Sequence, residues 1–436
     1  MVTLPVVSWG RLARERHAVV PVYDQTLVPD AIAVASKPTL AHGNGRSYGD
    51  VALNPGGSLL MTRGLDRFTA FDRESGIVTC EAGVLLRDII EVALPHGWFP
   101  PVLPGTQFVT VGGAIANDVH GKGHHATGCL GEYVRRLTLL RTDGTKIECG
   151  PGLQPDWFAA TVGGMGLTGF IVDAQIQLRR VSGPWLDTES CVFDSLDEFF
   201  RLSAQAEDSW EYSVAWIDCA NRGSGDARGV FFRGNHAACP DKAAPSRART
   251  FPVTPPFSLV NAFSLSLFNK TYFQAHRIRQ GRRRQHYLPF FFPLDNILEW
   301  NRMYGAHGFY QYQCVLPKAV EEPAVRELLA AISAAGAGSF LAVLKTFGRR
   351  LSPGMMSFPM HGTTLALDFP NQGERTLRLF ERLNAVVKNA GGRLYPAKDA
   401  CMPRDLFEAG YPKRTEFLRF RDPGISSAMS RRLMGN

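Results

Sequence analysis

The stretch "AHGNGRSYGDVALN", residues 41–54, places Gly43, Gly45 and Gly49 within seven residues, among an arginine, a serine and a tyrosine. Glycine reaches positive φ without steric penalty and lets other groups approach the main chain, so this run predicts either a tight turn or close contact with a ligand. The preceding "KPTLAHG" predicts a short strand entering a loop, whose N–H groups could surround an anion with Arg46 adding charge. The spacing is neither that of a Walker loop nor that of a Rossmann motif.

Two further glycine-rich stretches follow, "PGTQFVTVGGAIANDVHGKGHHATGCLGEYV" at 104–134 and "ATVGGMGLTGFIV" at 160–172. The first contains three histidines, but no carboxylate or cysteine completes a ligand set at helical spacing, so we expect no metal. Three such stretches in one region predict a long ligand threaded through it. A cofactor with a pyrophosphate group and a flat ring would fit, because glycine leaves N–H groups and backbone open to both.

Composition and termini indicate the setting. With 436 residues and 45% hydrophobic content the chain can form one large or two smaller packed domains. Its eight cysteines form no C-x-x-C pair, which favours a reducing compartment over a zinc site or a disulfide framework. The start, "MVTLPVVSWGRLARERH", has no signal-peptide pattern, and no apolar run reaches membrane-spanning length. We therefore expect a cytoplasmic protein.

The net charge of +8 is concentrated in "HRIRQGRRRQH", residues 276–286. This run lies between the aromatic-rich segments "FSLVNAFSLSLFNKTYF" and "YLPFFFP", in a region without regular periodicity. Such a mixture suits an anionic membrane surface. A solvated loop over an ordinary core remains an alternative, whereas nucleic acid is not expected because no recognition motif accompanies the charge.

The hydrophobic pattern predicts an α+β fold. Residues 30–180 alternate short strand-like runs with one clear helix, "LLRDIIEVALPHG", which should stop at Pro95 and Gly97. After Val181, longer helical segments such as "TLRLFERLNAVVKNAG" alternate with strands such as "YQYQCVLP" and "TTLALDF". We place a boundary near residue 183.

Four motifs together resemble one family of flavoproteins. "GNGRSYGD", "PGTQFVTVGGAIANDVHGKGHH", "ATVGGMGLTG" and "GGRLYPAKD" are similar to the vanillyl-alcohol-oxidase-type (PCMH-type) proteins, whose FAD-binding domain consists of two α+β subdomains. "YSVAWIDC", "PLDNILEWNRMYGAHGFYQYQCVLP", "SFLAVLKTFG" and "LALDFP" resemble its decaprenylphosphoryl-β-D-ribose 2′-oxidase branch. That branch oxidises a polyprenyl-phosphoryl ribose as the first half of its epimerisation to an arabinose donor.

The resemblance implies a three-part organisation. Residues 1–183 would form the FAD-binding domain, and residues 184–392 an α+β substrate domain with an antiparallel sheet. Within the latter, residues 257–292 would form a mobile lid. Residues 393–436 would return to the FAD domain.

The resemblance also implies the cofactor residues. They would be Ala41, His42, Gly43, Asn44, Gly45, Arg46, Ser47, Tyr48, Gly49, Asp50, Val51, Gly105, Thr110, Val111, Gly112, Gly113, Asn117, Asp118, Val119, His120, Ile171 and Tyr395. Similar sugar and aldonolactone oxidases carry, at the position of Arg46, a histidine that links covalently to the flavin. A guanidinium cannot form that link, so we expect non-covalent FAD.

Oxidation of a secondary alcohol needs a proton acceptor and a cation for the reduced flavin. Lys398, in "LYPAKD", matches the family's active-site lysine and could act as a base if burial lowers its pKa, or as a fixed cation if it stays charged. His120 is the next candidate base, and Tyr48 completes the expected catalytic group.

The resemblance places a substrate pocket around that centre. Its residues would be Lys122, Trp216, Gln311, Gln313, Lys345, Phe347 and Lys398. Gln311 and Gln313 alternate on a predicted strand and could present two amides to a sugar. The mycobacterial relative has a reactive cysteine where this chain has Ala366, so covalent capture at that position should not occur here.

Two rival functions remain open at this level. A soluble FAD-dependent alditol or aldonolactone oxidase would share the FAD loops without a site for lipid phosphate, and a non-catalytic polyprenyl-phosphate binding protein would retain only the fold. The resemblance further implies a short-chain dehydrogenase partner that uses NAD(P)H for the reductive half of the epimerisation. It also implies peripheral association with the inner membrane, with the periplasmic face as an alternative.

Overall fold

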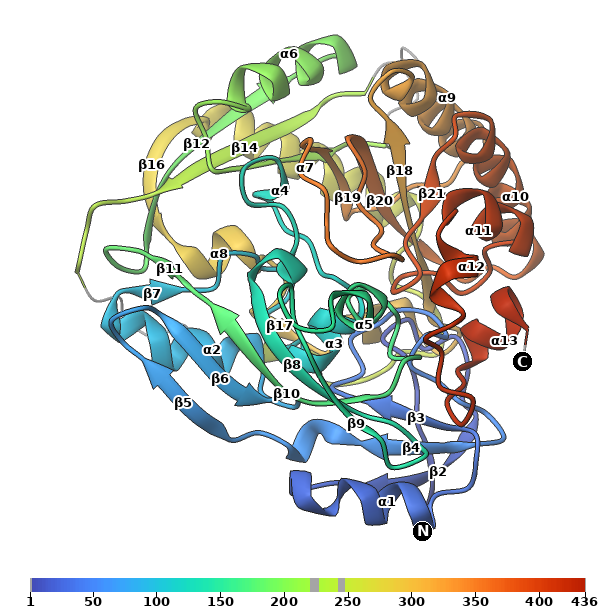
Figure 1. Ribbon diagram of the computed structural model, residues 1–436. Helices are drawn as coiled ribbons and strands as arrows, with labels where there is room; N and C mark the ends of the chain where they lie inside the picture. The colour runs from blue at the N-terminus through green and yellow to red at the C-terminus, as the bar shows by residue number, and fades with distance from the viewer. Residues whose placement is uncertain (1, 220–226, 242–247, 436) are drawn as a thin grey trace.

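The computed structural model describes residues 2–219, 227–241 and 248–435, and three main sheets organise it (Figure 1). The first has the order β1-β2-β4-β3, formed by Val2–Pro5, Arg16–Pro21, Ser58–Met61 and Thr39–His42. In it, β3 and β2 both run parallel to β4. The second is antiparallel, β5-β6-β10-β8-β9, formed by Phe68–Asp72, Ile77–Glu81, Phe170–Gln177, Val134–Leu140 and Lys146–Cys149.

The third sheet is antiparallel and contains eight strands. Its order is β16-β12-β14-β13-β19-β20-β18-β21, formed by Gly281–His286, Trp185–Phe193, Gly229–His236, Tyr212–Ile217, Ala342–Phe347, Gly362–Pro370, Phe309–Pro317 and Arg393–Leu394. Two small pairs complete the strands: β7 (Trp98–Phe99) with β11 (Arg179–Arg180), and β15 (Arg249–Thr250) with β17 (Ile297–Leu298). The proposed boundary at residue 183 lies between β11 and β12.

The longer helices agree with the periodic segments of the sequence. They are α2 (Leu86–Ala93), α6 (Leu196–Ala206), α7 (Ala262–Arg279), α9 (Glu321–Ala334) and α10 (Glu374–Asn389). The shorter ones are α1 (Val28–Val34), α3 (Val111–Ala116), α4 (His124–Thr127), α5 (Pro155–Thr161), α8 (Tyr287–Phe291), α11 (Arg404–Gly410), α12 (Arg414–Phe417), α13 (Ala428–Met434) and 3₁₀ turns at Gln25–Leu27, Thr62–Gly64, Leu94–His96, Leu130–Tyr133 and Trp300–Tyr304. The α+β prediction is confirmed, and α2 ends as expected, because Gly97 (φ 77°) follows the turn that contains Pro95.

The basic, aromatic segment is more regular than its sequence predicted. Half of residues 257–292 forms the 18-residue helix α7, which is followed by the edge strand β16 paired with β12. The periodicity is hard to detect because α7 exposes one face, buries a second against the sheet and turns a third toward a cavity. Whether this segment moves as a lid stays a prediction.

The C-terminal elements close on the first glycine-rich loop. A Cβ on Gly49 would lie 1.5 Å from the carbonyl oxygen of Asp399, so only glycine allows this approach. Arg432 of α13 then bridges the two segments, with its guanidinium 2.8 Å from carboxylate oxygens of both Asp50 and Asp399. In Figure 1 these C-terminal helices (red) flank the large sheet and lie near the N-terminal sheet.

No helix within the described ranges is both long and apolar enough to cross a bilayer. The same part of the chain contains no group of three or more His, Cys, Asp or Glu side chains arranged to hold a metal ion.

Candidate active site

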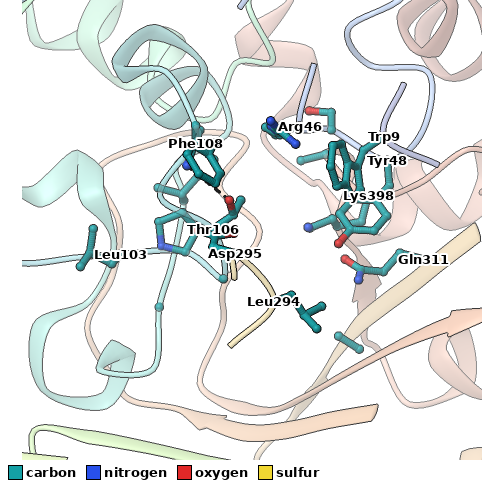
Figure 2. Close-up of a pocket in the computed structure, with 18 of the residues that line it drawn as sticks. Trp9, Arg46, Tyr48, Leu103, Thr106, Phe108, Leu294, Asp295, Gln311 and Lys398 are labelled. Carbon is teal, nitrogen blue, oxygen red and sulfur yellow. Dashed lines mark hydrogen bonds between the residues drawn. The ribbon is translucent and has the colours of Figure 1, made fainter. Parts of the chain in front are cut away.

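A single cavity of about 680 Å³ runs between the glycine-rich loops and the large sheet. Ligand pockets commonly occupy roughly 300–1,000 Å³, so the volume of this cavity is that of a ligand-binding site. Figure 2 shows Arg46, Trp9, Tyr48, Lys398 and Gln311 on one side of it, with Phe108, Leu103, Thr106 and Asp295 opposite. The cavity therefore joins segments that are far apart in the sequence.

The first glycine-rich loop offers hydrogen-bond donors to the cavity. Within the described residues, the backbone N–H groups of residues 43–47 donate to no protein acceptor. Arg46 stacks over the Trp9 ring, 4.2 Å from its centroid, and its Nε has no partner there either. Consecutive unpaired N–H groups beside a guanidinium form an anion-binding nest, which fits a pyrophosphate.

The second glycine-rich stretch is partly helical. Helix α3 begins after Thr110, whose Oγ1 accepts from the N–H of Gly113, and Gly112 donates to the carbonyl of Ala82. Its first N–H groups are therefore already satisfied, and α3 contributes shape more than donors. A Cβ added to Gly105 would have no atom within 4 Å, so the backbone there stays open to a flat group.

Most of the expected residues line this cavity. From the cofactor set these are Ala41, Gly43, Asn44, Gly45, Arg46, Ser47, Tyr48, Val51, Gly105, Thr110, Gly112, Gly113, Asn117, Val119, His120, Ile171 and Tyr395, and from the substrate set Lys122, Trp216, Gln311, Gln313, Lys345 and Lys398. Unpartnered buried atoms in this group include Asn117 Oδ1 and His120 Nδ1. The residues present therefore fit a bound FAD.

Four expected cofactor residues support the lining without forming it. His42 Nδ1 is 2.9 Å from the carbonyl oxygen of Ala52, and Val111 is a fully buried core residue. Gly49 and Asp50 hold the C-terminal elements, as described above. Their roles are to fix the loop that carries Arg46.

Asp118 and Phe347 also lie behind the lining. Asp118 is fully buried and accepts from Gly131 N (2.9 Å), Ser357 Oγ (2.6 Å) and Ser352 Oγ, so its charge stabilises the turn after α3. Phe347 packs edge-on against the His120 ring, with centroids 4.9 Å apart. It positions that imidazole and does not form an apolar wall of the substrate pocket.

Three half-buried lysines, Lys122, Lys345 and Lys398, converge on the cavity. Lys122 donates to the carbonyl of Phe291 (2.9 Å) and Lys345 to that of Gly121 (3.2 Å). Burial lowers the pKa of Lys122 to about 8, with Asp295 opposing the shift. Burial, followed by repulsion from Lys122 and Lys398, lowers the pKa of Lys345 to about 7. Such a group of under-compensated cations attracts an anion.

Lys398 faces a buried carboxylate. Its Nζ lies 3.9 Å from the centroid of the Tyr48 ring, a cation–π contact that fixes the ammonium group. Burial lowers its pKa, whereas the charge of Asp368 raises it. Asp368 is itself fully buried, and its Oδ1 accepts from Gln311 Nε2 at 2.6 Å. The lysine therefore sits at the balance between its neutral and charged forms.

The hydrogen bonds around His120 favour a donor role. Thr364 Oγ1 donates to the carbonyl of Cys314, so it accepts from Gln313 Nε2, and this orients the amide. The same nitrogen then donates to His120 Nε2 (3.0 Å), which leaves the proton of the neutral ring on Nδ1. Burial, with repulsion from Lys345, lowers the pKa of His120 well below its usual value. His120 thus offers an N–H group to a ligand rather than a free lone pair that could accept a proton.

The two glutamines differ from the expected picture of paired sugar-binding amides. Both line the cavity, but the amide nitrogens of Gln311 and Gln313 are hydrogen bonded to Asp368 and His120, respectively. They position these two groups for the chemistry.

Sequence reasoning missed several lining residues. They are chiefly Trp9, Thr106, Phe108, Asp295, Phe268, Tyr272 and Phe340. Thr106 and Phe108 lie in the second glycine-rich stretch, and Asp295 and Phe340 lie in segments that resemble the family, but none of the four was assigned a role. The aromatic content of residues 257–292 indicated Phe268 and Tyr272 only in general terms. Asp368, which lies next to the site, was within the quoted "LALDFP" without being assigned a role.

Comparisons with known proteins agree with this geometry. The family model described as "FAD binding domain" matches residues 17–150. The decaprenylphosphoryl-β-D-ribose oxidase of Mycolicibacterium smegmatis is 36% identical over 456 aligned positions, covering 99% of this chain and 97% of that protein. An uncharacterised protein of Streptomyces coelicolor is 31% identical over 80% of this chain and 100% of its own length. The L-gulonolactone oxidase of Mus musculus is 31% identical over 44% of this chain and 45% of its own.

The glycine-lined cavity beside three half-buried lysines and the matching domain family define the protein as an FAD-dependent oxidoreductase of the PCMH-type α+β fold. The full-length similarity is more specific. This chain belongs to the decaprenylphosphoryl-β-D-ribose oxidase family.

We expect the FAD to be dissociable. The resemblance implies that a linking histidine would stand at the position of Arg46, and a guanidinium cannot form that covalent link. The Arg46 guanidinium instead lies 4.2 Å from the centroid of the Trp9 ring and 5.3 Å from that of Phe108. Acid precipitation of the yellow protein should release the chromophore into the supernatant. Flavin fluorescence that stays with the denatured polypeptide on a gel would contradict this expectation.

Proposed function

We propose that the protein oxidises the 2′-hydroxyl of a polyprenyl-phosphoryl-β-D-ribose to the 2′-keto sugar, the first half of epimerisation to an arabinose donor. The observation that carries this proposal is the position of three half-buried lysines beside a group of aromatic side chains that line the same cavity. Lys122, Lys345 and Lys398 supply positive charge, and Trp216, Phe268, Tyr272 and Phe340 line the same cavity. The lysines suit a phosphodiester group, and the aromatic side chains suit a prenyl chain.

The chain's own residues then have distinct tasks. FAD, when bound, supplies the acceptor for the hydride from the carbinol carbon. Lys398 in its neutral form takes the hydroxyl proton, so the two electrons and the proton leave the substrate together. His120 donates its Nδ1–H to an oxygen of the sugar, while Lys122 and Lys345 hold the phosphate.

The rival alditol and aldonolactone oxidases act on neutral sugars. Such a substrate gives no reason to bury three lysines without an equal number of carboxylates, since each buried cation costs solvation free energy. A non-catalytic binding protein would not need Lys398 beside a buried carboxylate. Both rivals are therefore less well supported.

The 2′-keto product needs a reductive step to become arabinose. We propose that a short-chain dehydrogenase using NAD(P)H supplies it. We also propose a peripheral location at the cytoplasmic face of the inner membrane, with the periplasmic face as the alternative. Fractionation after fusion to a reporter active on only one side would distinguish the two faces.

The function is tested by anaerobic mixing of the holoenzyme with farnesyl-phosphoryl-β-D-ribose. We expect the flavin absorbance to bleach, and a 2′-keto product to be detected by mass spectrometry after borodeuteride trapping. Xylitol and L-gulonolactone should not bleach it at comparable concentration. Bleaching by either of these, with none by the prenyl-phosphoryl ribose, would contradict the proposal.

A further inference from the structure

Exposed apolar side chains are concentrated in one short region. Of the 19 large hydrophobic residues that are exposed among the described residues, seven lie in residues 253–278: Val253, Phe257, Leu259, Phe263, Leu267, Phe268 and Ile278. Phe263 and Ile278 are 79% and 83% exposed. A cluster of this kind on an otherwise well-packed protein marks an interaction surface.

Helix α7 presents these residues on one face. Phe263, Leu267 and Ile278 follow helical spacing along the outer side, with Lys270 and Arg277 beside them. The opposite side is anchored: Leu265, Asn269 and Phe273 are buried there. The amide of Asn269 donates to Asp218 Oδ1 at 2.8 Å, and Phe273 packs with Trp216 and Val230. The outer face is thus held outward on a fixed helix.

The charge of the region is one-sided. No Asp or Glu occurs between Asp241 and Asp295. Of the basic residues in between, Arg284 and Arg282 on β16 face Asp187 and Glu189 of β12. The exposed cations of α7 are Lys270, Arg277 and Arg279, and no carboxylate within the described residues pairs with them. The surface is therefore apolar and cationic at once.

The third face of α7 borders the cavity. Phe268, Tyr272 and His276 line it, together with Arg283 of β16. Tyr272 packs against Trp216, with ring centroids 4.7 Å apart. One helix therefore separates the cavity from the exposed apolar surface by a single layer of side chains.

We propose that the outer face of α7 docks onto an anionic lipid bilayer, so that a membrane-held polyprenyl chain passes beside α7 into the cavity. An amphipathic helix with Phe and Leu on its outer face and Lys and Arg beside them lies in the plane of the interface, with its apolar side chains below the headgroups. Nucleic acid gives no reason to expose Phe263 and Leu267. A second copy of this chain is a less suitable partner, because two copies of the same cationic face would repel each other. The link to turnover rests on the proposed function, whereas docking itself does not.

Vesicle flotation of the holoenzyme tests the docking. Phosphatidylcholine vesicles with phosphatidylglycerol should carry the protein at low salt, and pure phosphatidylcholine vesicles should not. The triple variant Lys270→Gln, Arg277→Gln, Arg279→Gln should lose on the order of 100-fold in partitioning. The double variant Phe263→Ser, Leu267→Ser should also lose binding. The matched controls change exposed residues elsewhere on the protein. The triple variant Arg73→Gln, Arg382→Gln, Arg419→Gln controls for the loss of charge, and Leu351→Ser controls for the loss of exposed apolar surface. Both should bind vesicles as the parent does.

Three outcomes of the vesicle and light-scattering measurements would overturn the docking surface. The first is that the protein binds neutral and anionic vesicles equally well. The second is that either α7 variant binds vesicles as well as its control does. The third is that the only effect of the variants is the loss of a dimer, measured by light scattering without lipid. Tighter binding to RNA than to vesicles, insensitive to the Phe263 and Leu267 changes, would point to nucleic acid instead and also refute it.

Turnover separates this inference from the proposed function. The α7 variants should keep the kcat/KM of the parent for water-soluble farnesyl-phosphoryl ribose and lose it for a long-chain substrate embedded in vesicles. A parent enzyme that floats normally yet oxidises neither substrate would refute only the function. Equal loss on both substrates would show that α7 acts on the active site itself and would refute delivery from the membrane.

Discussion

Lys398→Ala should fold and bind FAD like the parent enzyme, while the rate of flavin reduction falls about 10²–10⁴-fold, the usual effect of losing a general base. The lysine side chain touches Tyr48 and faces Asp368, and its Nζ donates no hydrogen bond to another of the described residues. Its backbone N–H, which donates to the carbonyl of Tyr395, is kept in the alanine variant. Stopped-flow mixing with farnesyl-phosphoryl ribose under anaerobic conditions measures the rate. The flavin content of the purified variant measures FAD binding, and thermal unfolding measures whether the variant is folded.

Lys398→Arg separates the two roles that the sequence left open. The guanidinium keeps the positive charge but does not readily release its proton, so a reduction rate near that of the alanine variant supports base catalysis. Appreciable flavin reduction would instead assign Lys398 an electrostatic role. The exposed Lys413→Ala serves as a control. Parent-like rates in Lys398→Ala would show that the proton acceptor lies elsewhere.

Asp368→Asn should move the pH dependence of flavin reduction toward lower pH. The carboxylate raises the pKa of Lys398, so its removal leaves burial unopposed and lowers that pKa further. Because the neutral amine is the active form, the rate falls at low pH as Lys398 becomes protonated, and a lower pKa shifts this fall to lower pH. At a pH below the pKa of Lys398 in both proteins, each unit by which that pKa is lowered makes the variant about tenfold faster than the parent.

The other groups around Lys398 and Asp368 determine which control variant is suitable. The side-chain amide of Gln311 donates to Asp368 Oδ1, and Asp368 Oδ2 has no hydrogen-bond partner within the described residues. Tyr48 and Tyr304 face the carboxylate, and burial raises the pKa of each hydroxyl, so neither is charged near neutral pH. Lys345 and His120 are repelled by Lys398. The exposed Asp143→Asn should leave the limb in place. An unmoved limb in Asp368→Asn, in a variant that still binds FAD, would contradict the coupling.

Local patterns were sufficient for most elements of the fold. The strand at Thr39–His42 and the helix at Glu374–Asn389 depend on β-branched or apolar residues at periods that a short window displays. Helix α7 was missed, because three environments around one helix leave no single apolar stripe for such a window to detect.

The candidate site divides in the same way. The glycine-rich loops were recognisable, because bare backbone is visible in sequence. The partner of Lys398 was not, because Asp368 lies opposite Gln311 only through the register of β18 and β20, two strands separated by 44 residues of chain. Asp118 and Phe347 matched the family motifs but face away from the cavity, since a motif does not specify the direction of a side chain.

The packing of Gly49 on Asp399 also constrains how the protein is made. Arg432 and Asp50 are 382 positions apart, so a ribosome must add 382 residues after Asp50 before Arg432 can hold the first glycine-rich loop in place. Closing so long a loop carries an entropic cost that only the finished contacts repay. Until then, the first glycine-rich loop lacks the contacts that fix it, and FAD gains its full stabilising effect by binding the state in which those contacts have formed.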